Sequence, residues 1–184
     1  VGVTSQTYSH RSVDASRKGV LPQSLEWSVA NRLSYIFDFQ GPSMPVDTAC
    51  SASLSAVHQA CESLRRGECR IALVGGVNLY LHESRYQALC EMEMLSQKGY
   101  CHSFGEEADG FLPGEGVAAI VLKPLSEAVN DGDRIHGVIS GTGISHSGKT
   151  AGYTVPGPVA VGELVSSTLA RAGIDFSTLG YIEA

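Results

Sequence analysis

The residues best suited to covalent chemistry lie at 45–53, where the chain reads PVDTACSAS. A short segment around Val46 leads into Cys50, and the residues that follow carry apolar side chains at helical spacing, namely Leu54, Val57, Cys61 and Leu64. Cys50 therefore falls at the start of a predicted helix over 51–66. Unsatisfied N–H groups and the helix dipole favour negative charge there, so a thiol ionises more readily to the nucleophilic thiolate. Neighbouring N–H groups can bind an oxyanion, which makes Cys50 a candidate for covalent acyl transfer.

The side chains around Cys50 permit this chemistry without requiring it. Its small neighbours leave room for an acyl chain: Ala49, Ser51, Ala52 and Ser53. Asp47 is expected to orient the segment before the cysteine. From the residues alone, a buried cysteine that caps a core helix is the commoner interpretation, and both stay open.

The remaining cysteines and histidines do not have metal-site spacing. Four cysteines are interpreted as small buried hydrophobes: Cys61, Cys69, Cys90 and Cys101. The lack of a CxxC or CxxxxC pair argues against structural zinc, and so large and apolar a chain argues against a disulfide scaffold. His58 is too far along the helix to act as a base for Cys50 and is expected to pack against a neighbouring element. The adjacent pair Cys101 and His102 indicates a surface loop.

The composition is that of a globular, core-rich chain. Of the 184 residues, 43% are apolar and 17% are charged, and the net charge of −6 gives no basic footprint for nucleic acid. No apolar run approaches the ~20 residues of a membrane-spanning helix, and no signal peptide is evident. A soluble cytoplasmic protein that binds neither nucleic acid nor membrane is expected.

Alternation of short apolar runs with amphipathic stretches predicts an α/β fold. Helices are expected to begin near Ser24 and Ser51, the second ending before Gly67, and a third is expected over 161–169, ending at Gly173. Strands are expected over 70–77, 116–122 and 134–143, and from Tyr181. A turn is expected at 130–133 and a loop over 148–158, while Gly141 and Gly143 indicate a bulge or tight packing.

Residues 45–53 resemble the active-site signature of the β-ketoacyl synthases of the thiolase superfamily. The resemblance extends from about Ser24 to the last residue and includes further motifs at 31–35, 41–43, 60–69, 75–78, 108–111, 114–116 and 181–184. Three loops are most similar to bacterial modular polyketide synthases whose acyltransferase acts in trans: 103–106, 112–116 and 148–156. Ser145 stands where the family pattern has Asn, and Ser147 where a second small residue is usual, which puts the acyl pocket in doubt.

The resemblance implies part of the thiolase-like α/β fold, in which two similar halves stack. Residues 1–133 would form much of the first half and residues 134–184 the start of the second, without an N-terminal segment and a large C-terminal one. The complete domain is expected to be a homodimer. Two catalytic histidines of the family would lie beyond Ala184, so the chain on its own is expected to be inactive.

The implied reaction is a decarboxylative Claisen condensation. Cys50 would accept an acyl chain from the phosphopantetheine arm of an acyl carrier protein, and the enolate of malonyl on a second carrier would attack it, with no bound cofactor or metal. Thr154 is expected to contact the pantetheine, the alternative being a turn-stabilising hydroxyl. Asp109 and Glu115 are expected to hold loops together by hydrogen bonds.

Three alternatives share the cysteine. A fatty-acid β-ketoacyl synthase has the same chemistry, although the loops at Phe104 and Lys149 argue against it. A thiolase has the same fold, but the context of Cys50 fits carrier-protein enzymes better. A non-elongating ketosynthase, which only binds and transfers acyl chains, keeps the cysteine and loses a histidine.

Overall fold

The computed structural model describes residues 1–2 and 25–183. Its sheet, as far as those residues show it, consists of β1 (Ala72–Asn78) and β2 (Gly116–Leu122), which pair antiparallel from Ala72↔Leu122 to Asn78↔Gly116. The bounds of β2 are those predicted, and β1 begins two residues later than predicted. On the free side of β1, Gly2 forms parallel bridges to Gly76 and to Val46. The segment that leads to Cys50 is thereby aligned with the sheet.

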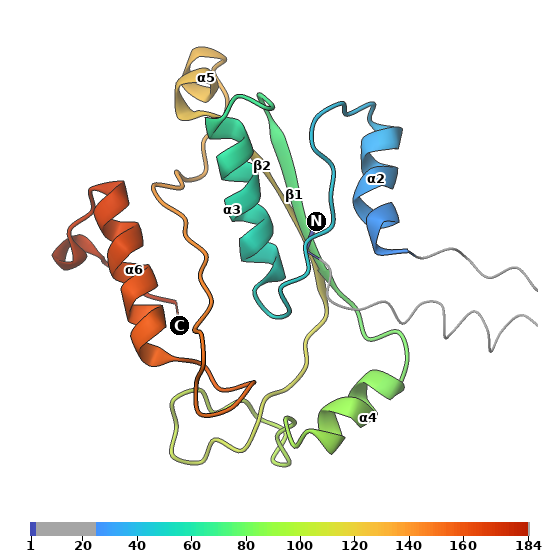
Figure 1. The fold of residues 1–184 in the computed structure, drawn as a ribbon. Coiled ribbons are helices and arrows are strands. Elements are labelled where there is room, and N and C mark those ends of the chain that lie inside the picture. The colour runs from blue at the N-terminus through green and yellow to red at the C-terminus, as the bar shows by residue number, and fades with distance from the viewer. Residues whose placement is uncertain (3–24, 184) are drawn as a thin grey trace, which may run out of the picture.

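Two helices pack near β1 (Figure 1). α2 (Glu26–Ile36) begins one residue after Leu25, its N-cap, and the predicted cap Ser24 lies outside the described residues. α3 (Ala52–Arg65) contacts β1 through a face of small buried residues: Ala52, Ser55, Ala56 and Ser63. Gly67 takes the left-handed conformation just past α3, with φ of 71°, as the sequence predicted. Small side chains let α3 approach the sheet closely, which fixes the position of the first residues of α3 relative to β1.

Two short helices were not predicted. α4 (Ser84–Glu91) lies between the strands in sequence, and α5 (Leu125–Asn130) follows β2 and ends in the predicted turn, where Gly132 has a φ of 71°. Each has one buried residue, Leu89 in α4 and Ala128 in α5. So short an apolar stripe gives little periodicity for a sequence pattern to detect.

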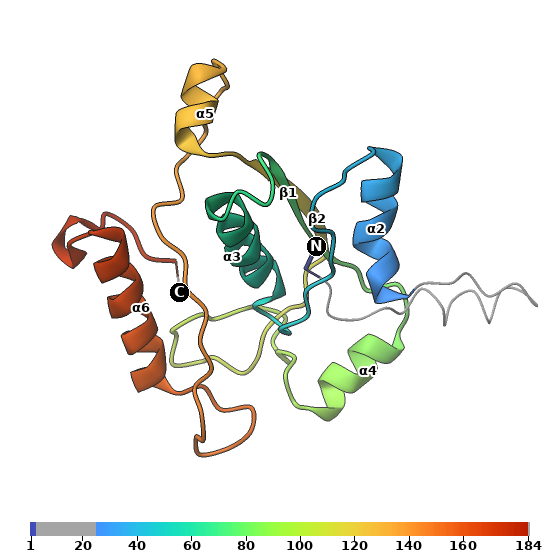
Figure 2. The same ribbon diagram turned by 45° about the horizontal axis from the view of Figure 1, so that its top comes forward.

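The C-terminal part corrects two predictions. Residues 134–143 form no strand; they run between α3 and α6 (Pro158–Ala172), as Figures 1 and 2 show. Tyr181 likewise begins no strand, and the only element after α6 in the described chain is the short 3-10 helix η1 (Phe176–Thr178). A β-strand needs a neighbour to share its backbone hydrogen bonds, and neither segment pairs with one among the described residues.

Tight packing, one of the two readings offered for Gly141 and Gly143, is confirmed. A Cβ at Gly141 would lie 3.0 Å from the Ala172 Cβ, and one at Gly143 would overlap Thr168 and lie 2.9 Å from Leu164 Cδ1. α6 spans the predicted 161–169 and is followed by Gly173, which is left-handed with φ of 66°, as predicted for the residue that ends this helix. Among the described residues no helix is both long and apolar enough to cross a membrane.

Candidate active site

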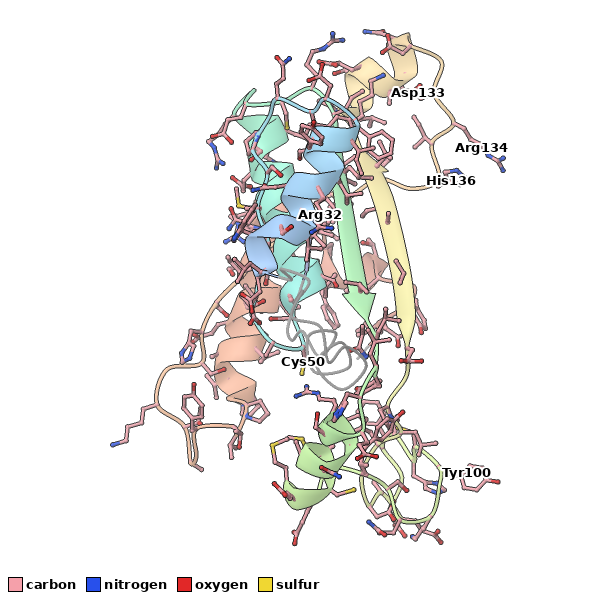
Figure 3. All side chains as sticks on the ribbon, turned by 90° about the vertical axis from the view of Figure 1, so that its right-hand side faces the viewer. Arg32, Cys50, Tyr100, Asp133, Arg134 and His136 are labelled. Atoms are coloured by element: carbon pink, nitrogen blue, oxygen red, sulfur yellow. The ribbon has the colours of Figure 1, made fainter. Side chains whose placement is uncertain are left out.

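Cys50 lies in a tight turn at the start of α3 (Figure 3), where the sequence placed it. The Ser51 N–H donates to the Thr48 carbonyl at 3.3 Å, and the Ala52 N–H donates to the Ala49 carbonyl at 3.0 Å. Between them Ala49 takes the left-handed conformation, with φ of 51°. That conformation costs an L-residue roughly 1–2 kcal/mol, so the turn must be held by its surroundings.

A cluster of three hydroxyls holds this turn. The Ser51 hydroxyl donates to the Thr48 carbonyl at 2.8 Å and lies 3.0 Å from Thr48 Oγ1. The Thr48 hydroxyl in turn donates to Ser55 Oγ at 2.8 Å, and Ser55 is only 6% exposed. Sequence reasoning missed this cluster, although hydroxyls three and seven residues apart at a helix start are a local signal for it.

Asp47 has the orienting role expected of it. Its Oδ1 accepts from the Ala49 N–H at 3.0 Å, which ties the carboxylate to the left-handed residue itself. Together with the hydroxyl cluster, this bond offsets the backbone strain at Ala49, since each hydrogen bond contributes ~1 kcal/mol. The result is a rigid turn that presents Cys50 on the surface.

The five cysteines are free thiols in different environments. Cys61 and Cys69 are partly buried, and burial raises the pKa of each thiol. Cys90 is exposed at the end of α4, so its interpretation as a buried hydrophobe is wrong. Cys101 is exposed in a loop, which confirms the surface loop predicted for Cys101 and His102 and not a buried hydrophobe. Cys50 is exposed in this structure, and the N-cap of α3 is Ser51, so Cys50 is not the buried cap of that helix here.

The polar residues predicted to have structural roles have them. His58 Nδ1 lies 2.8 Å from Thr142 Oγ1, so His58 packs against a distant segment as predicted. Asp109 accepts from the Ser96 hydroxyl at 2.7 Å and from the Gln97 N–H at 3.1 Å, and these bonds hold the pKa of its carboxyl below the ordinary value. Glu115 accepts from the Tyr80 N–H. Both carboxylates thus join loops by hydrogen bonds.

Thr154 lies exposed in a loop over 148–157, without a hydrogen bond to any described residue. The turn-stabilising role proposed as its alternative belongs to Thr150, whose hydroxyl contacts the carbonyls of Gly152 and Val155, each at 2.7 Å. The loop that contains Thr154 lies at the end of the molecule where α3 begins (Figures 1 and 2).

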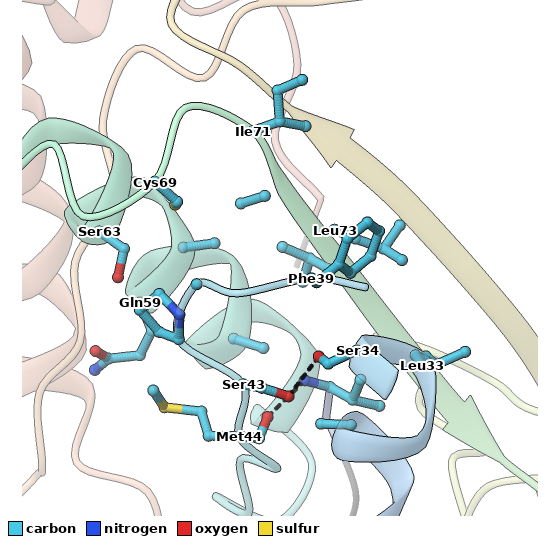
Figure 4. Close-up of a pocket in the computed structure, with 18 of the residues that line it drawn as sticks. Leu33, Ser34, Phe39, Ser43, Met44, Gln59, Ser63, Cys69, Ile71 and Leu73 are labelled. Atoms are coloured by element: carbon cyan, nitrogen blue, oxygen red, sulfur yellow. Dashed lines mark hydrogen bonds between the residues drawn. The ribbon is translucent and has the colours of Figure 1, made fainter. Parts of the chain in front are cut away.

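A cavity of about 630 Å³ lies elsewhere, between α2, residues 38–46, α3 and β1 (Figure 4). Its lining is mostly apolar and includes Leu33, Phe39 and Leu73. Two of its polar lining residues are hydrogen-bonded, since the Ser34 hydroxyl donates to Ser43 at 2.7 Å, and the Ser43 hydroxyl donates in turn to Asn31 at 2.9 Å. Cys50 does not line this cavity, so it is separate from the reactive turn.

Comparison with known proteins gives consistent matches. A family model described as the N-terminal domain of beta-ketoacyl synthase matches residues 1–128. Polyketide synthase PksL of Bacillus subtilis is 54% identical over 157 residues, which are 85% of this chain and 4% of PksL. Polyketide synthase PksM of the same organism is 50% identical over 185 residues, covering 100% of this chain and 4% of PksM.

Solved structures agree with these matches. The oxazolomycin ketosynthase domain OzmH KS7 of Streptomyces albus superimposes with a TM-score of 0.93 at 43% identity, over 99% of this chain and 32% of that one. The module 6 ketosynthase of the bacillaene synthase of Bacillus subtilis gives 0.84 at 39% identity, over 94% and 30%. The chain thus spans about a third of the solved domains and a few per cent of the synthases.

Proposed function

This chain belongs to the β-ketoacyl synthase family, with part of its thiolase-like fold, and we propose that it carries the acyl-accepting nucleophile, Cys50, of a polyketide synthase ketosynthase domain. The observation that carries the proposal is the exposed thiol in a rigid turn at the start of α3. The sequence identity to polyketide synthases favours a role in polyketide synthesis rather than in fatty-acid synthesis.

In the first half-reaction the Cys50 thiolate attacks the carbonyl of an acyl thioester carried on the phosphopantetheine of an acyl carrier protein. The carbon–sulfur bond to the carrier breaks, the carrier thiolate leaves, and the acyl group stays on Cys50. The oxyanion that forms in between lies at the N-terminal end of α3, where the helix dipole and backbone N–H groups stabilise negative charge. The left-handed Ala49 shapes the turn that leads from Cys50 into α3.

In the second half-reaction, malonyl on a carrier protein loses carbon dioxide and its enolate carbon attacks the acyl-Cys50 carbonyl. A carbon–carbon bond forms, the carbon–sulfur bond breaks, and the Cys50 thiolate is released. We propose that decarboxylation is assisted by residues of the complete domain outside this chain. The chain alone should therefore form no ketide, and ketide formation by it with acyl- and malonyl-carrier proteins would contradict this.

The finer features of the proposal rest on sequence alone. Residues 103–106, 112–116 and 148–156 favour a bacterial modular synthase whose acyltransferase acts in trans, and bacterial synthases are among the similar proteins. Thr154 would contact the pantetheine arm from its exposed loop. A homodimeric, cytoplasmic complete domain without a bound cofactor or metal completes the proposal.

The test uses the complete domain, that is, a whole ketosynthase domain that contains this sequence. Cys50→Ala and Cys50→Ser are incubated with an acyl-pantetheine thioester, and loading is read as the mass increase of the intact protein. Loading should disappear in both variants. Cys90→Ser is the matched control, because Cys90 is another exposed free thiol, and it should load like the unaltered domain. Loading that persists without the Cys50 sulfur overturns the proposal.

A further inference from the structure

His58 makes a long-range contact that the proposed chemistry does not use. It lies on α3, the helix that follows Cys50, and its Nδ1 is 2.8 Å from Thr142 Oγ1 across 84 residues of sequence. Both side chains are partly buried. A bond of this kind between two segments fixes their relative position, because neither partner can be replaced freely by water.

Thr142 is held from both sides. Its hydroxyl faces His58 on α3, while its carbonyl accepts from Arg171 Nη2 on α6 at 3.4 Å. The neighbouring Gly141 and Gly143 pack so tightly on α6 that a Cβ at either position would crowd that helix. Since residues 134–143 have no strand pairing among the described residues, these contacts set where the segment lies between the two helices (Figure 1).

The loop over 148–157 begins five residues after this segment ends and is held by internal hydrogen bonds. Its ends are joined where the Gly157 N–H donates to Ser147 Oγ at 3.3 Å, and Thr150 closes its interior. A loop that holds its own shape moves as one body, so its place relative to α3 depends on where it is anchored. Thr142 is the anchor on the side of α3.

We propose that His58 is a positioning residue for the carrier-borne substrate, acting through Thr142 on the placement of loop 148–157 relative to Cys50. This deepens the proposed function and rests on it. The bonds of Asp47 and of the three hydroxyls at the turn around Cys50 do not involve His58 or Thr142. His58 should therefore govern binding of the pantetheine arm and leave the reactivity of the thiol unchanged.

The experiment separates these two properties in the complete domain. For His58→Ala we expect the KM for loading from an acyl-pantetheine thioester to rise about tenfold, as for loss of one partly buried hydrogen bond, with kcat within about twofold. The rate at which iodoacetamide alkylates Cys50 should be unchanged. His58→Asn, whose amide can occupy the place of Nδ1, should restore the KM.

Thr142→Val should raise the KM like His58→Ala, and the double variant should add little, because both changes remove the same bond. His136→Ala is the matched control: it lies exposed on the same segment, far from Cys50 in Figure 3, and should leave every parameter unchanged.

Two results would overturn the inference while the proposed function stands. One is an unchanged KM in His58→Ala. The other is a parallel loss of loading and alkylation that His58→Asn fails to restore, which would make His58 a residue of the fold only. If the unaltered domain loads no acyl group, both the proposed function and the inference fall.

Discussion

Replacing Gly76 with alanine should disturb the junction on which the reactive turn rests. Gly76 lies in β1 against the first turn of α3, and a Cβ built on it would come closer to Ser53 Oγ than the 3.0 Å that real Cβ atoms respect. The same Cβ would lie 3.3 Å from the Ser53 Cβ. Because of these contacts, β1 and the start of α3 would have to move apart. Ser53 is three residues from Cys50, so this movement would occur next to the reactive turn.

The size of the effect follows from those two contacts. Overpacking of this kind typically costs about 1–3 kcal/mol. The contact at 3.3 Å needs a shift of only a few tenths of an ångström, so the overlap with the Ser53 hydroxyl accounts for most of the cost. We expect a loss of about 1.5 kcal/mol, roughly tenfold in the unfolding equilibrium. In a Ser53→Ala background the hydroxyl is gone, and the same change should cost less than about 0.5 kcal/mol.

The assay is a double-mutant cycle on the complete domain, with stability taken from the urea unfolding midpoint and slope. Gly116→Ala is the matched control, because Gly116 is also a strand glycine and a Cβ there meets nothing within 4 Å. The reasoning is refuted if Gly76→Ala is as mild as Gly116→Ala, or if its cost is the same with and without the Ser53 hydroxyl.

Three further predictions concern other parts of the chain. Glu93 follows α4 with φ of 54°, so Glu93→Gly should raise the free energy of unfolding by roughly 0.5–1 kcal/mol, which a higher urea midpoint would show and a lower one contradict. Hydrogen bonds lower the pKa of the Asp109 carboxyl, so the stability it contributes should be complete above about pH 4 and be lost as pH falls through the folded-state pKa. The difference in free energy of unfolding between the unaltered domain and Asp109→Asn should therefore disappear in acid, and a difference that stays constant with pH would contradict this prediction. A cerulenin-like electrophile should label Cys50 faster than it labels the four other thiols, Cys61, Cys69, Cys90 and Cys101. Equal labelling of all five by mass spectrometry would contradict the assignment of Cys50 as the nucleophile.

The sequence predicted best what depends on neighbouring residues. The bounds of β2, the left-handed Gly67 and Gly173, and the place of Cys50 before a helix all follow from local patterns, and all are found. The left-handed Ala49 could not be predicted, because alanine carries no preference for that conformation. Its cause is the set of bonds that Asp47 and the hydroxyls make around it.

What the sequence could not give depends on partners far along the chain. Residues 134–143 are apolar enough for a strand, yet a strand exists only where a neighbour supplies hydrogen bonds, and a one-dimensional pattern does not contain that neighbour. The turn-stabilising role of Thr150 was not predicted for a related reason. Thr150 and Thr154 are both hydroxyl residues in one loop, and only the folded turn decides which one reaches its carbonyls.

The candidate site likewise combines local contacts with one contact between residues far apart in the sequence. The hydrogen bonds of Asp47 and the three hydroxyls around Cys50 lie within residues 47–55, whereas the contact that anchors the substrate loop joins His58 to Thr142. Changes at Thr48 should therefore slow alkylation and loading together, because they alter the presentation of the thiol. Changes at Thr142 should slow loading alone. A domain in which both classes of change had the same effect on both rates would show that nucleophile and substrate loop form one cooperative unit, and the separate roles assigned to them would be wrong.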